Sequence, residues 1–118
     1  MFEYSIPKSE QDEKQFAEMK NHWLLWHGTN HSNLISIMMK GLWIAPKNAH
    51  KHGNMFGDGI YFADMFDKAE MYSYGDDDVK YILLCEVALG KTHNTLIMAD
   101  SKIDPKQLQC NSIRGMGK

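Results

Sequence analysis

The chain has 118 residues, of which 43% are hydrophobic and 24% charged, which is typical of one ordinary globular domain with a modest core. Its 13 basic and 15 acidic residues give a formal net charge of −2, so charge offers no argument for broad binding to nucleic acids or membranes. The apolar runs are too short to span a bilayer, and the N-terminal residues are too charged for a signal peptide.

The first part of the chain predicts a strand followed by a helix. Apolar and polar residues alternate over 2–6 and end at Pro7, a pattern that favours a short strand. Ser9 stands three residues before Asp12, which resembles a capping box, and predicts a helix that reaches about Asn21.

The next segment predicts a second strand and helix. The apolar run 23–26 leads directly into His27 and Gly28, which predicts a buried strand with a sharp exit. From Ser32 onward apolar residues recur at helical spacing, and Gly41 follows as the C-terminal cap of that helix.

The middle of the chain predicts a loop, a short strand and a third helix. Residues 47–58 show no useful periodicity and predict a loop, whereas 60–63 predict a strand. Asp64 or Asp67 can cap a helix that runs to about Tyr74.

The strongest predicted strand covers residues 79–89. It is apolar on both faces, so we expect it in the middle of a sheet. After Gly90 the chain becomes a polar tail, with 96–98 as a further short strand. The predicted order is β-α-β-α-loop-β-α-β, a mixed α/β arrangement in one domain.

Residues 54–72 predict one wall of a nucleotide pocket, and residues 24–30 the opposite wall. Glycines let the backbone come close to a ligand, and the aromatic faces of Tyr61 and Tyr72 suit a flat ring. Neither GxGxxG nor GxxxxGK[ST] occurs in the sequence, so any nucleotide must be bound by other means.

Each of these residues also has a plainer interpretation. A single His27 at a strand end is more often just a satisfied polar residue than a catalyst. Tyr61 and Tyr72 taken singly are more often core aromatics, and Gly57 and Gly59 can serve only a turn. The functional interpretation therefore depends on the combination.

Other polar residues in the sequence give weaker predictions of function. His50 and His52 lack a third ligand at a recognisable spacing, so no metal site is predicted. The acidic run 76–78 is better explained as a solvated turn than as a cation site. Cys85 and Cys110 are far apart and predict reduced thiols in an intracellular protein, Cys85 as a small core hydrophobe.

Three blocks of the sequence resemble the catalytic domain of the poly(ADP-ribose) polymerase family, most closely its DNA-damage-responsive branch. They are LLWHGTNHSNLISIMMKGLWIAP (24–46), GNMFGDGIYFADMFDKAEMYSYG (53–75) and YILLCEVALGK (81–91). The resemblance implies an α+β ADP-ribosyltransferase fold, in which mixed, mainly antiparallel sheets form a cleft for NAD⁺. It implies that residues 1–118 are a single but partial catalytic domain, nuclear or cytoplasmic, without a DNA-binding module of its own.

The resemblance also implies residue roles. His27 bonds the adenosine ribose, and Gly28 holds the nicotinamide carboxamide through its backbone N–H and C=O. Tyr61 and Tyr72 stack on the two faces of the nicotinamide ring, and the catalytic residues are His27 and Tyr61. The further NAD⁺-binding positions are Thr29 and Asn33 on the adenosine side, Lys68 near the acceptor, and Gly59, Phe62, Ala63 and Ala69.

The implied reaction displaces nicotinamide from C1 of the ribose and transfers ADP-ribose to a protein or nucleic-acid acceptor. NAD⁺ is the substrate, and neither a metal nor a membrane is involved. Its oxocarbenium-like transition state calls for a carboxylate. The family's glutamate lies on a later strand, so we expect it to be missing from this sequence; Glu70 and Glu86 are not at its position.

Three consequences follow from the resemblance. The alternative function is a catalytically impaired module that binds NAD⁺ or nicotinamide without turnover. Missing C-terminal strands leave a sheet edge open, which a partner chain can cover. Ala69 stands where the family usually has a serine, and Trp43 where it commonly has an arginine.

Overall fold

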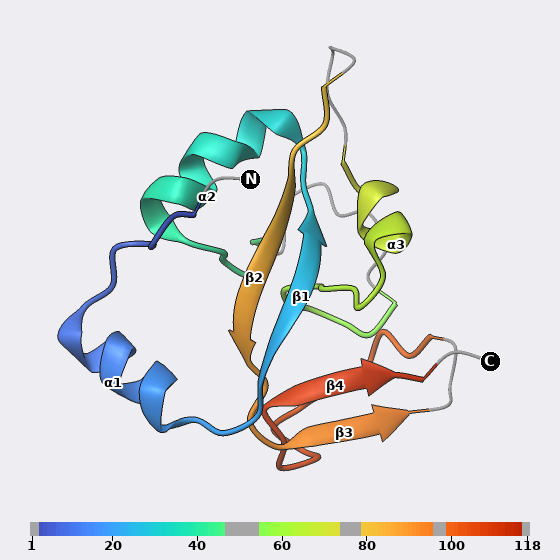
Figure 1. The fold of residues 1–118 in the computed structure, drawn as a ribbon. Helices are drawn as coiled ribbons and strands as arrows, with labels where there is room; N and C mark the ends of the chain where they lie inside the picture. The colour runs from blue at the N-terminus through green and yellow to red at the C-terminus, as the bar shows by residue number, and fades with distance from the viewer. Residues whose placement is uncertain (1–2, 47–54, 74–78, 96–98, 117–118) are drawn as a thin grey trace.

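The computed structural model describes residues 3–46, 55–73, 79–95 and 99–116. In chain order the elements are α1 (Glu10–Glu18), β1 (His22–Gly28), η1 (His31–Asn33), α2 (Leu34–Lys40), α3 (Phe66–Glu70), β2 (Ile82–Ala88), β3 (Thr92–Thr95) and β4 (Ser112–Gly115). β1 and β2 form an antiparallel pair in the centre, with α1 and α2 on the β2 side and α3 on the other, while β3 and β4 form a second, parallel pair (Figure 1). The architecture is α+β, and one of its two sheets is antiparallel.

Helix caps confirm the first two predicted helices. The Ser9 hydroxyl oxygen accepts a hydrogen bond from the Asp12 N–H at 3.2 Å and starts α1. The helix ends before the predicted Asn21, whose positive φ of 66° turns the chain toward β1. Gly41 caps α2 with a φ of 81°, as predicted.

The third helix is shorter than predicted and starts differently. Neither Asp64 nor Asp67 caps it: Met65 occupies the N-cap position in extended conformation and makes no side-chain cap bond. α3 ends at Glu70, and the predicted end at Tyr74 lies outside the described residues.

Two of the predicted strands form where expected, but in a different environment. β1 and β2 form as expected, yet among the described residues each pairs in a sheet of only two strands, so β2 is an edge strand and not a central one. With so few layers over the sheet, only Leu25 of β1 is buried, and Leu24 is 66% exposed. The predicted strand 60–63 is reduced to one bridge, in which Ala63 and Trp26 exchange two backbone hydrogen bonds of 2.8 Å.

Both ends of the sequence were predicted less well. Residues 3–6 form no strand, and residue 2 lies outside the described part, as do 96–98. The polar tail contains β3 and β4, which the sequence analysis missed because β3, THNT, and β4, SIRG, lack an apolar run. Arg114 of β4 joins the two sheets: its guanidinium lies 5.1 Å from the Trp23 ring and 4.0 Å from the Asp64 carboxylate.

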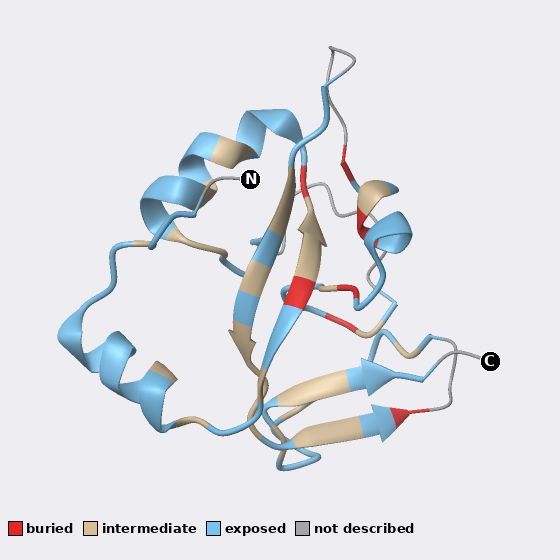
Figure 2. Ribbon diagram, in the orientation of Figure 1, coloured by how far each residue is buried: buried red, intermediate tan, exposed pale blue. Residues whose placement is uncertain are grey.

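The core is small and lies where β1 meets α3. Its buried apolar residues in the described part are Leu25, Ala63 and Ala69. Figure 2 shows the buried segments around β1 and α3, whereas α1 and α2 are mostly exposed. The accessible surface of 9696 Å² exceeds the roughly 6,600 Å² usual for a folded 13.6 kDa chain. Among the described residues, large apolar side chains such as Leu24, Ile35 and Trp43 are more than 50% exposed.

Two further predictions can be compared with the structure. Cys85 and Cys110 are both free thiols, as predicted, and burial raises the pKa of the half-buried Cys85. In the described part of the chain, no helix has the length and apolarity needed to cross a bilayer.

Candidate functional site

The central contact of the candidate site joins His27 to Tyr61. His27 lies near the end of β1, and its Nδ1 is 2.7 Å from the backbone carbonyl oxygen of Tyr61. The carbonyl can only accept, so Nδ1 carries the proton. The His27 ring also lies 5.5 Å from the Phe62 ring. Two predicted site residues therefore meet His27.

The same contact determines the chemistry of the imidazole. Burial lowers the pKa of His27, against the opposing effect of the hydrogen bond to Tyr61, so the neutral ring is favoured. With Nδ1 donating, Nε2 of the neutral ring holds a lone pair, and within the described residues it has no hydrogen-bond partner. His27 therefore offers an acceptor to a ligand hydroxyl.

Tyr61 is held through its hydroxyl and not through its ring. The hydroxyl donates to the Gly57 carbonyl oxygen at 2.6 Å and accepts from the Phe56 N–H at 3.1 Å. Tyr61 and Tyr72 are each 38% exposed, so neither is a core aromatic. Their rings remain available for stacking, and the loop that carries Tyr61 is tied to its own side chain.

Gly28 is required by close packing against α3. A Cβ atom at this position would overlap the carbonyl oxygen of Ala69 and lie 3.3 Å from the Cβ of Tyr72. A T-shaped contact between Trp26 and Phe66, with centroids 5.2 Å apart, also packs α3 against β1. The predicted residues Gly28, Ala69 and Tyr72 therefore lie together.

Strand geometry gives the direction of the Gly28 backbone groups. Trp26 uses its N–H and C=O with Ala63, away from β2. Since these groups alternate between the two edges of a strand, those of Gly28, two residues further on, point to the same side. This backbone pair is thus directed away from β2, toward the α3 side of the sheet.

For four other predicted site residues the structure gives a position but no contact that indicates a role. Thr29 is buried directly after β1, and Asn33 is exposed at the junction of η1 and α2. Gly59 is exposed, with no heavy atom within 4 Å of an added Cβ, and Lys68 is exposed on α3.

The structure gives supporting roles to residues of the predicted wall 54–72 that the sequence analysis did not name as site residues. Phe56 and Gly57 hold the Tyr61 hydroxyl, and Phe66 holds α3 through Trp26. Gly57 has a φ of 78°, and the recurrence of glycine at 57 and 59 was the one available signal for a tight turn here.

Two glutamates near the site already have partners. Glu70 of α3 accepts from the Lys80 ammonium at 3.0 Å, and Glu86 of β2 lies 3.0 Å from Nδ1 of His22. Both pairs are partly exposed to solvent, and that neither glutamate stands at the position of the family's catalytic glutamate stays a prediction from the sequence.

A cavity of about 400 Å³ lies elsewhere. Its lining includes residues of α1, the C-terminal half of β2 and the segment around Phe62. Among the individually predicted site residues, only Phe62 lines it. Among residues 3–46, 55–73, 79–95 and 99–116, no three His, Cys, Asp or Glu side chains gather as metal ligands. His50, His52 and the acidic run 76–78 lie outside these ranges.

Comparison with known proteins identifies relatives. Residues 1–118 match the family described as "Poly(ADP-ribose) polymerase catalytic domain". The chain is 44% identical over 107 residues to "Poly [ADP-ribose] polymerase 2" of Arabidopsis thaliana, 41% over 107 to "Poly [ADP-ribose] polymerase 1" of Xenopus laevis, and 38% over 117 to "Poly [ADP-ribose] polymerase 2" of Homo sapiens. These alignments cover 89%, 89% and 98% of this chain, but only 17%, 10% and 20% of the relatives.

Proposed function

Since the chain belongs to the poly(ADP-ribose) polymerase catalytic-domain family, we propose that it forms part of an NAD⁺-dependent ADP-ribosyltransferase domain. The reaction transfers ADP-ribose from NAD⁺ to a protein or nucleic-acid acceptor and releases nicotinamide. The observation that supports this best is the meeting of His27 with Tyr61 and of Gly28 with Ala69 and Tyr72.

Each residue has a proposed role that suits its geometry. Nε2 of neutral His27 accepts a hydrogen bond from a ribose hydroxyl. The Gly28 N–H and C=O pair with the nicotinamide carboxamide, to which a side chain at this position would be an obstacle. Tyr61 and Tyr72 supply the stacking faces. Thr29, Asn33, Gly59, Phe62, Ala63 and Lys68 are proposed as the outer parts of the same site.

The test is nicotinamide release. The 118-residue chain is incubated with NAD⁺ labelled in the nicotinamide ring, beside a Tyr61→Ala variant. Release that the variant abolishes supports the transferase. NAD⁺-dependent thermal stabilisation without release favours the second candidate function instead.

That second candidate is a module that binds NAD⁺ or nicotinamide without turnover. It is favoured by the engagement of Glu70 with Lys80 and of Glu86 with His22, which leaves neither carboxylate for the sugar. Loss of a charged catalytic group lowers the rate by orders of magnitude. Even slow turnover of NAD⁺ by this chain would therefore contradict the second candidate function.

We also propose that residues 1–118 are one partial domain whose outer β2 edge is covered by a strand of a partner chain, with a second copy as the occupant. Alternation places the backbone N–H and C=O of Leu84 on that edge, and Leu84 is 40% exposed. Sedimentation should show a dimer that Leu84→Pro disperses, because proline removes an outward donor and leaves the β1 ladder intact. A monomer at every concentration contradicts this.

A further inference from the structure

The cavity beside β2 is lined on one side by α1. Phe16 of α1 and Met19, directly after the helix, form this side, and Val87 of β2 lines the other. Phe62 lines it too, while its ring lies 5.5 Å from the His27 ring. The cavity is therefore adjacent to the candidate site, and whatever moves α1 changes the solvent access of a side chain that contacts His27.

α1 has few means of staying in place. None of its residues is buried, and it stands beside the sheet and not on it (Figure 1). Its first turn is acidic, but its last turn has no basic residue, so its own side chains do not compensate the negative end of the helix dipole. The side chain that compensates this end comes from outside the helix.

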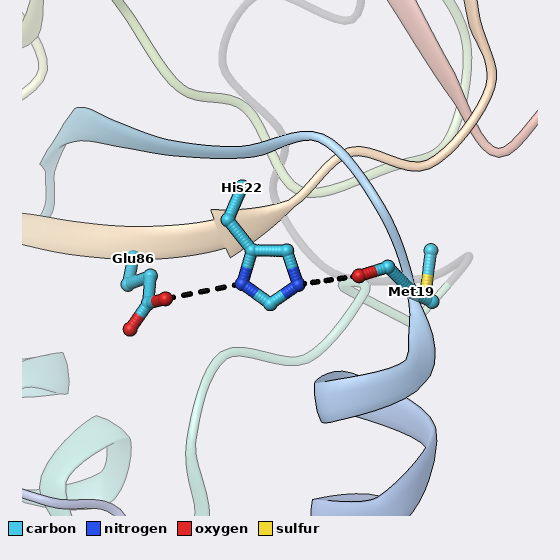
Figure 3. A network of polar contacts seen from close by, with 3 residues as sticks. All are labelled: Met19, His22 and Glu86. Carbon is cyan, nitrogen blue, oxygen red and sulfur yellow. Dashed lines mark hydrogen bonds and ion pairs between the residues drawn. The ribbon is translucent and has the colours of Figure 1, made fainter.

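His22 provides that attachment. Its Nε2 is 2.7 Å from the carbonyl oxygen of Met19, directly after α1, and its Nδ1 is 3.0 Å from the Glu86 carboxylate on β2 (Figure 3). The Phe16 ring of α1 packs against the imidazole, with centroids 4.7 Å apart. One side chain thus joins the helix end to the sheet.

Only a charged imidazole can make both of these hydrogen bonds at once. A carbonyl oxygen and a carboxylate can only accept, so both ring nitrogens must donate, whereas neutral imidazole has a single N–H. The cation also lies at the C-terminal end of α1, where positive charge is favourable. Deprotonation therefore breaks one of the two bonds, whichever proton is lost.

We propose that His22 is a pH-sensitive catch that holds the C-terminal end of α1 to the sheet beside the cavity and releases it when the imidazole loses a proton. The ionisable group in direct contact with it is Glu86 on β2; Cys85 on β2, Asp12 on α1 and Lys8, whose ammonium lies 4.0 Å from the Phe16 ring centroid, line the neighbouring cavity. The His22 side chain is 25% exposed, so its proton exchanges directly with solvent.

The hydrogen bond to Glu86, followed by that to Met19, raises the pKa of His22. The stabilisation of α1 by His22 is thus fully present below the ordinary histidine pKa and is lost as the pH rises through the raised value.

Hydrogen exchange of the 118-residue chain between pH 6 and 9 tests the catch. After correction for intrinsic exchange rates, protection of residues 10–19 should fall by about fivefold with rising pH, while that of β1 and β2 stays constant. In His22→Gln the protection of α1 should not depend on pH. His93→Gln, a substitution on β3, should retain the wild-type dependence.

A second measurement needs no substitution at His22. NMR titration of the wild-type imidazoles should place the His22 midpoint above that of His27, and Glu86→Gln should lower it because the charge is lost while an acceptor remains. Protection of α1 that is constant over this pH range, or that varies equally in His22→Gln, overturns the proposal.

Discussion

His27 and Tyr61, 34 residues apart in the sequence, are joined by a hydrogen bond from the imidazole Nδ1 to the Tyr61 carbonyl oxygen, 2.7 Å in length. The bond orients the imidazole and selects its tautomer, and it holds the Tyr61 backbone against β1. The two proposed catalytic residues are thus related through a main-chain atom, which a substitution of the Tyr61 side chain leaves in place.

This contact predicts an acid-sensitive site. Burial lowers the pKa of His27, so the stability that its neutral form contributes is fully present above the ordinary histidine pKa and is lost as the pH falls through the lowered value. NAD⁺ affinity, measured by calorimetry from pH 8 to 5, should fall over that range because Nε2 then becomes a donor. His27→Gln should show weaker binding with a flatter pH profile; equal profiles would contradict the assignment.

Gly28→Ala should disrupt the packing of α3. The added Cβ overlaps the Ala69 carbonyl oxygen, so the helix has to shift, at a cost of about 1–3 kcal/mol in unfolding free energy. Gly59→Ala is the matched control, since nothing lies within 4 Å of its added Cβ. Urea unfolding of both variants checks this, and similar losses of stability would refute the proposed close approach.

Tyr61→Phe separates the ring from the hydroxyl. It removes the bonds to Gly57 and Phe56, which should cost about 0.5–1.5 kcal/mol each in stability, while nicotinamide affinity changes little because the stacking face remains. Tyr61→Ala should lose the affinity as well. Thermal unfolding and a nicotinamide titration distinguish the two effects, and equal affinity in all three proteins would exclude stacking on Tyr61.

Ala69→Ser tests the proposed position of the carboxamide. Ala69 is 2% exposed and its backbone carbonyl lies against Gly28, and in the proposed site a serine hydroxyl at this position would bond the carboxamide. One added neutral hydrogen bond should strengthen nicotinamide binding by about 0.5–1.5 kcal/mol, or roughly 2- to 12-fold in Kd. Ala63→Ser serves as the comparison, and unchanged affinity in Ala69→Ser places the carboxamide elsewhere.

Local patterns predicted much of the secondary structure. The Ser9 cap, the Gly41 cap and the strands β1 and β2 could be read from neighbouring residues, because capping and backbone preference act within a few positions. The predicted N-cap of α3 was wrong. Both Asp64 and Asp67 suited the local pattern, but Met65 occupies the N-cap position in the structure. The prediction that β2 lies in the middle of a sheet was wrong. Apolar residues on both faces indicate that a strand is stabilised by burial, but they do not show that a further strand is there to cover it.

The candidate site was likewise predicted in part by local sequence patterns and in part visible only in the structure. Motif resemblance identified His27, Gly28, Tyr61 and Tyr72 from one sequence, and the structure brings them into two adjoining contacts. It did not identify Phe56 or Phe66, whose contribution is to hold other side chains in place. Such supporting contacts leave no local pattern.

The sequence by itself determined the family, the short-range caps and the residues suited to an NAD⁺ pocket, because these depend on residue type and spacing. The tertiary structure alone decided which nitrogen of His27 is free, why position 28 needs glycine, and why the pKa of His22 is raised. The partners that decide these properties lie far along the chain, 64 residues away for His22 and Glu86. Only the pairing of β1 with β2 and the packing of α3 bring such atoms within hydrogen-bonding distance.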